Sequence, residues 1–157
     1  MRRSNSRAVI AILLLSMASV GYGPCPKKNP LSSVEGIDRV EAKLNQAANA
    51  LNTLAKTNRA LYQKNVINLN ERRTVAGVIN KANTGLDKIT DRVFQIDPNN
   101  PDSIASGKID AVVLLNTVSV ELGKINFGPE ELRLAVQAII AIVNEAIDLT
   151  RRVKEIR

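Results

Sequence analysis

Apolar side chains recur at alternating spacings of three and four residues over most of the chain after residue 32, and this restricts the fold most. Such spacing places them on one face of an α-helix, whereas a half-buried strand alternates at every second residue. A helix with one apolar face buries that face against other helices. The pattern therefore predicts an all-α protein whose helices pack along apolar faces.

The first helical segment is predicted to begin at Ser32, which forms a capping-box pattern with Glu35. Its seam has heptad spacing and runs on to Asn65 through Ile37, Val40, Leu44, Ala47, Leu51, Leu54, Asn58 and Leu61. We expect Asn65 to face water. For Asn58 the pattern allows either burial with a hydrogen-bond partner or exposure.

The second segment begins with another capping pattern, Asn68 followed by Glu71, and ends before the proline-rich run at 97–101. Its apolar face consists of Val75, Val78, Ile79, Ala82, Leu86, Ile89, Val93 and Ile96. Gly77 and Gly85 lie inside it, where each costs about 1 kcal/mol relative to Ala. Close packing of a neighbouring helix would explain both glycines.

The third segment is predicted to begin near Asp102 or Ser103 and to end with Gly123 as its C-terminal cap. Its core stripe is Ala111, Leu115, Val118, Leu122 and Ile125, and we expect Ile109, Val112 and Val113 to widen it. The valines would also suit a strand, but a lone strand has no partner for its backbone. A helix is therefore predicted here.

The fourth segment has Pro129 at its predicted first position, with Phe127 and Leu132 spaced as a hydrophobic staple. Its predicted seam is Leu132, Ala135, Ile139, Ile142, Ala146, Leu149, Val153 and Ile156. Short links between long helices favour antiparallel neighbours. The sequence predicts an antiparallel up-down four-helix bundle with long heptad-patterned helices over residues 32–157, preceded by a signal or anchor helix.

Residues 1–23 have the pattern of a secretory signal or membrane anchor. Arg2, Arg3 and Arg7 precede the uncharged stretch 8–20, which is short for a stable membrane span. We expect export with cleavage after Ala18 rather than after Gly23. In the alternative, an uncleaved anchor, the arginines would still leave the bundle outside the cytoplasm. Residues 24–31 form a Pro- and Lys-containing linker.

Cys25 is the only cysteine and follows the apolar stretch closely. Lipidation, pairing with another chain and a free thiol are the three alternatives for it. The preceding Tyr22, Gly23 and Pro24 do not resemble a usual lipidation signal, so the free thiol is preferred.

The composition excludes many enzyme chemistries. The chain has no His and one Cys, so it lacks an imidazole base, a thiolate zinc cluster and a redox pair. Its carboxylates lie among Lys and Arg at helical spacing, as solvated surface pairs do. We expect no enzyme, no cofactor, no metal and no small-molecule substrate. Without residues 1–23 the charge is 19 minus 15, or +4, which is weak evidence for nucleic-acid binding.

Two function classes follow from this pattern. The first is an exported or membrane-anchored, non-catalytic helical bundle that acts as a protein-protein interaction or structural module, with a protein partner or self-association. The alternative is a lipid-binding or membrane-active bundle, with membrane contact possible through residues 8–23. A predicted interaction patch lies where the first seam loses its apolar character, at Asn58, Leu61, Tyr62 and Asn65.

Overall fold

The computed structural model describes residues 36–94, 96–97 and 99–153, and these residues form four helices packed against one another. The helices are α2 (Ile37–Gln63), α3 (Leu69–Phe94), α4 (Pro101–Gly123) and α5 (Glu130–Arg152). The predicted all-α fold is confirmed for this part of the chain. The predicted segments 1–23 and 24–31, with Cys25, lie outside the described residues.

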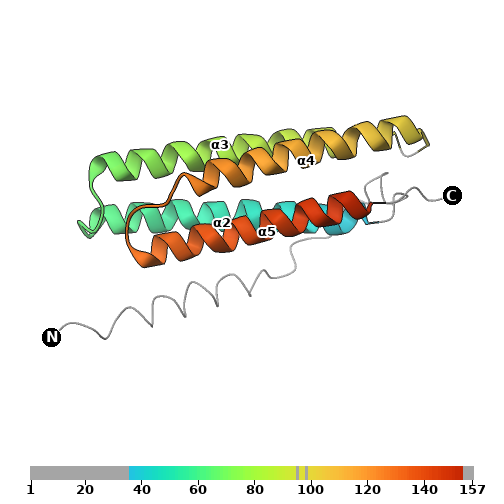
Figure 1. The fold of residues 1–157 in the computed structure, drawn as a ribbon. Helices are drawn as coiled ribbons and strands as arrows, with labels where there is room; N and C mark the ends of the chain where they lie inside the picture. Colours follow the sequence, from blue (N-terminus) through green and yellow to red (C-terminus); the bar gives the residue numbers. More distant parts are fainter. Residues whose placement is uncertain (1–35, 95, 98, 154–157) are drawn as a thin grey trace, which may run out of the picture.

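The four helices lie side by side in an elongated bundle, and successive helices run in opposite directions (Figure 1). Each helix packs on the helices next to it in sequence, and α2 closes the ring against α5. The α2–α3 and α4–α5 connections lie at one end of the bundle. The α3–α4 connection lies at the other end, with the first turn of α2 and the last turn of α5.

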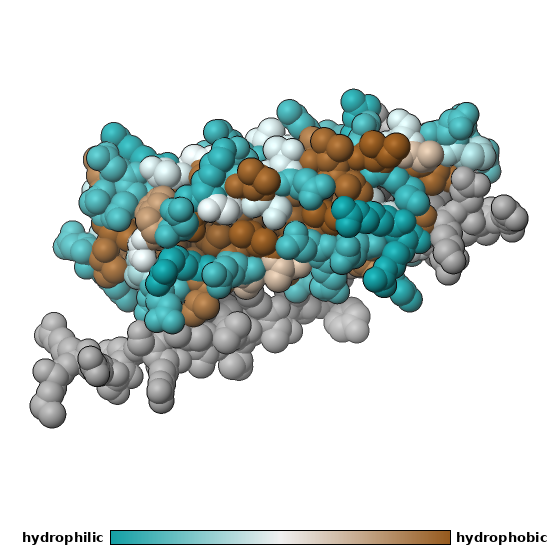
Figure 2. Space-filling view, in the orientation of Figure 1, coloured by the Kyte–Doolittle hydropathy of each residue, from teal (hydrophilic) through white to brown (hydrophobic). Residues whose placement is uncertain are grey.

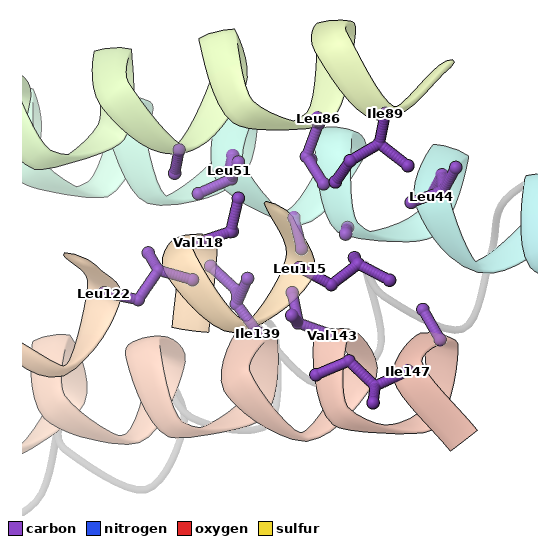
Figure 3. Close-up of a cluster of buried hydrophobic side chains, with 14 of the residues drawn as sticks. Leu44, Leu51, Leu86, Ile89, Leu115, Val118, Leu122, Ile139, Val143 and Ile147 are labelled. Carbon is purple, nitrogen blue, oxygen red and sulfur yellow. The ribbon is translucent and has the colours of Figure 1, made fainter. Parts of the chain in front are cut away.

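Aliphatic side chains from all four helices meet along the bundle axis (Figure 3). Burying one such side chain stabilises the fold by about 1.5–3 kcal/mol relative to leaving it exposed. The largest fully buried ones are Leu51, Leu54, Ile89, Leu115, Leu122, Leu132, Ile139, Val40, Val75, Val118 and Val143. The predicted seam of α2 is buried from Ile37 as far as Asn58.

The buried stripe of α5 departs from the predicted heptad seam. Ile142 and Leu149 are only half-buried. The buried residues of α5 are Leu132, Ala135, Val136, Ile139, Val143, Ala146, Ile147 and Thr150. A straight helix drifts by about 20° per heptad relative to a strict seven-residue repeat. The contact line of α5 therefore moves one position along the sequence in its second half.

The α2–α3 connection is closed by backbone and side-chain caps. Asn65 has a φ of 54°, and the amide of Val66 donates to the carbonyl of Leu61 at 2.9 Å, as in a Schellman motif. The predicted capping box of α3 is confirmed. The Asn68 amide donates to Glu71 Oε2 at 2.8 Å, and the Glu71 amide donates to Asn68 Oδ1 at 3.0 Å.

The first turn of α2 has a different cap from the predicted one. The helix begins at Ile37, and its N-cap residue is Gly36, whose φ is 95°. Glycine has no side chain that could accept a capping hydrogen bond. The left-handed backbone suits glycine because glycine has no Cβ. The predicted cap pair, Ser32 with Glu35, lies outside the described residues.

The other helix ends differ from the predicted ones by about one residue. Helix α4 starts at Pro101, because Asn100 Oδ1 accepts from the amides of Asp102 and Ser103 at 3.0 and 3.3 Å. Gly123 is its last helical residue, and Lys124 caps the helix in a right-handed conformation, so the predicted glycine cap is wrong. Pro129 is the N-cap of α5 rather than its first helical residue.

The two glycines of α3 have different surroundings. A Cβ added at Gly85 would lie 2.5 Å from Val118 Cγ2 of α4, whereas one added at Gly77 would meet no atom of the described part of the chain within 4 Å. Close helix packing therefore explains Gly85, as predicted, and does not explain Gly77. The absence of a Cβ at Gly85 allows α3 to approach α4 over the buried Val118.

The substitution Gly85→Ala is expected to lower the free energy of unfolding by about 1–3 kcal/mol, because the added Cβ would overlap the fully buried Val118. The matched control Gly77→Ala should raise it by about 0.5–1 kcal/mol through helix propensity. Urea denaturation followed by circular dichroism measures both changes. Equal stabilisation by the two substitutions would contradict the close α3–α4 contact.

Candidate functional site

The predicted interaction patch lies at the end of the bundle that holds the α2–α3 connection. Asn58 is 4% exposed, so its side chain lies in the interior. Its Nδ2 donates to the carbonyl oxygen of Arg72 on α3 at 3.0 Å, while its buried Oδ1 has no hydrogen-bond partner among the described residues. Asn58 thus resolves the two sequence alternatives in favour of burial, and it connects α2 to α3.

The other residues of the predicted patch have separate surroundings. The Arg72 guanidinium lies over the Tyr62 ring at 4.8 Å from its centroid. Leu61 is half-buried and packs against the core, whereas Asn65 is exposed, as expected. Arg72 brings Asn58 and Tyr62 together, but Asn58 and Leu61 point largely inward. Docking at this patch stays a prediction.

A more continuous apolar surface lies on the outer face of α4. Ile109, Val113 and Val120 expose 65%, 58% and 66% of their surface. The prediction that Ile109 and Val113 widen the core stripe is therefore wrong, whereas the half-buried Val112 packs against the core as predicted. The core-facing side is occupied by Ile104, Ala111, Leu115, Val118 and Leu122, and at 100° per residue the three exposed side chains point away from it.

This outer face has the character of a contact surface. Residues 111–120 contain no charged side chain, and Asn116 and Thr117 are the exposed polar residues between Val113 and Val120. Figure 2 shows hydrophobic residues gathered along α4 and along the line between α4 and α5. Ile140 of α5 is half-buried and packs against the hydrophobic core. Large exposed apolar surfaces often mark binding sites.

The composition of α4 was the available sequence signal for this surface. Among the described residues, α4 alone is long and apolar enough to cross a membrane by length and composition, a criterion that core helices of soluble proteins also meet. An all-round apolar helix is typically buried on all sides. Here one face packs on α3 and α5 while the opposite face is exposed.

A small charged cluster lies at the C-terminal end of α4. Glu121 pairs with Lys124 on its own helix end and with Lys81 of α3 at 3.6 Å. The hydrogen bond from Lys124 is the largest effect and lowers the pKa of Glu121. Desolvation comes second and opposes it, while the charges of Lys124 and Lys81 lower the pKa further. The pair with Lys81 links α3 to α4 beside the apolar face.

The depressed pKa of Glu121 predicts a pH-dependent contribution to stability. Above the ordinary pKa of a glutamate, the ionised side chain stabilises the fold, and this contribution is lost as the pH falls through the lower folded-state pKa. The Glu121→Gln variant should therefore be less stable than the wild type at pH 7, with a difference that shrinks on acidification. Urea midpoints across pH 3–7 test this expectation, and a constant difference would contradict it.

Within the described ranges, no three or more His, Cys, Asp or Glu side chains come together in a group that could hold a metal ion. No family model, curated protein or solved structure matches the chain.

Proposed function

We propose that this protein is an exported or membrane-anchored, non-catalytic helical bundle that acts as an interaction or structural module and binds protein through the outer face of α4. The observation that carries the proposal is the exposure of Ile109, Val113 and Val120 on one face, at 65%, 58% and 66%. The predicted signal or anchor in residues 1–23 would place this surface outside the cytoplasm.

The chemistry of this face supports protein binding. The core of a protein interface is depleted in charged residues, and the outer face of α4 carries no charge between residues 111 and 120. The opposite face is anchored by the fully buried Leu115 and Leu122, so the exposed side chains stand on a packed helix. A rigid surface of this kind loses little conformational freedom on binding.

Lipid binding is the second candidate, and the length and apolar character of α4 favour it. Helices that lie on a membrane surface are usually rich in Lys and Arg on their polar face. Residues 109–123 contain neither Lys nor Arg, and α4 buries five residues in the bundle core. These two observations favour protein as the partner of this face.

Site-specific photo-cross-linking in intact cells tests the proposed function. A photoreactive amino acid at the exposed position 116 of the full-length chain should give a discrete protein adduct. The matched control is position 52, which is exposed on α2. The substitution Val120→Asp should reduce the adduct because it places a charge on the contact surface. Lipid adducts alone at position 116 would favour the membrane alternative, and the absence of adducts would contradict both.

A further inference from the structure

We propose that the partner of the α4 outer face is a second copy of this chain, and that the two α4 helices pack antiparallel across a two-fold axis. This inference rests on the proposed function, because it names the occupant of the same surface.

The outer face of α4 carries a seam of its own. Six exposed residues follow one another at spacings of three, four, three, four and three: Ser106, Ile109, Val113, Asn116, Val120 and Gly123. We call these residues the outer seam. Alternation of three and four is the spacing by which two helices pack side chains into each other. The bundle core already uses the opposite side of α4.

The outer seam is self-complementary in the antiparallel direction. Reversing one copy pairs Ile109 with Val120 of the second copy, and Ser106 with Gly123 of the second copy. Large side chains then meet large ones and small meet small. A Cβ added at Gly123 would meet nothing within 4 Å, so the space beside it is free within the described part of one copy. A two-fold interface requires such matching of a surface with itself.

The central layers pair Val113 with Asn116 of the second copy. This places Asn116 of each copy close to the symmetry axis, where one polar residue in an apolar seam fixes the register and weakens the association. The outer seam spans about 25 Å, because an α-helix rises 1.5 Å per residue. An interface of this length predicts a reversible dimer rather than a permanent one.

Charge favours the antiparallel direction over the parallel one. Asp102 lies exposed at the N-terminal end of α4, and Lys124 lies exposed just past its C-terminal end. An antiparallel pair brings Lys124 of each copy toward Asp102 of the other, whereas a parallel pair brings like charges together. The helix dipoles of an antiparallel pair also oppose each other favourably.

Disulfide trapping in cells tests this arrangement on the full-length chain. Two copies with different tags, both carrying Cys25→Ser, are co-expressed, one with Val113→Cys and the other with Asn116→Cys. Oxidation should yield a disulfide-linked dimer that contains both tags. The matched control places Asn52→Cys and Ala55→Cys on α2, at the same spacing and also exposed, and should give only background linkage.

A second pair determines the direction of packing. Ile109→Cys with Val120→Cys should link in the antiparallel dimer, whereas Ile109→Cys with itself should not. Adding Val120→Asp to the pair at 113 and 116 should reduce the linkage to background. All four positions are exposed, so these changes leave the bundle core intact.

Linkage of Ile109→Cys only with itself would overturn the antiparallel arrangement. If no α4 pair links more than the α2 control does, the second copy is not the partner of this face. The same result is expected if residues 8–20 are the occupant. The photo-cross-linking result then separates the two proposals. An adduct at position 116 with a different protein would still support the proposed function. The absence of any adduct there would contradict the proposed function as well.

Discussion

Replacing Ile139 by Asp is expected to abolish cooperative folding, whereas Arg152→Ala should change the free energy of unfolding by less than about 0.5 kcal/mol. Ile139 is fully buried on α5 and lies among the core side chains of the bundle (Figure 3). An unpaired charge at this position costs several kcal/mol. The total stability of a domain is only about 5–15 kcal/mol, so this loss removes most of it.

Arg152 is the matched control for this substitution, because it lies exposed at the last residue of the same helix. Thermal melts followed by circular dichroism at 222 nm compare the two variants with the wild type. We expect a sharp melt for Arg152→Ala and a broad or absent transition for Ile139→Asp. Similar melting temperatures for the two variants would mean that α5 packs through a different face.

The cores of α2 and α3 and part of the cores of α4 and α5 could be predicted from the sequence because apolar spacing alone locates an amphipathic face. This worked best on α2 and α3, where charged residues occupy the opposite side and leave one possible buried face. It worked less well on α5, because the straight helix drifts away from a seven-residue repeat and buries Val143 and Ile147 in place of Ile142 and Leu149. The burial of Asn58 depended on the carbonyl of Arg72, which lies in another helix.

The candidate surface on α4 was hidden from sequence analysis for a related reason. The core stripe of α4 could be predicted, but the apolar Ile109 and Val113 gave no sequence contrast that marked them as lying on the outer side. The orientation is set by tertiary contacts, including the close approach of Gly85 to Val118. Once Val118 faces inward, Val113 and Val120 must lie on the exposed side. The surface therefore became visible only with the packing of α3 and α5 on α4.

The second large effect concerns export. Replacing Leu13 and Leu14 with Arg should block export of the full-length chain almost completely. Residues 8–20 contain no charge, and each Arg in the middle of such a segment costs about 2.5–3.5 kcal/mol on membrane-insertion scales. The two charges together add about 5–7 kcal/mol, which a segment of this length cannot offset. The matched control, Leu13→Ile with Leu14→Ile, keeps the segment apolar and should leave export unchanged.

Protease accessibility in intact cells or spheroplasts measures this effect. The wild-type bundle should be digested from outside, whereas the double-Arg variant should stay protected until the cells are lysed. Intact-mass measurement on the exported chain then distinguishes a cleaved signal from a retained anchor and shows any lipid on Cys25. A wild-type chain that stays protected and soluble with Met1 still attached would contradict export. In that case the α4 outer face would bind its partner inside the cytoplasm.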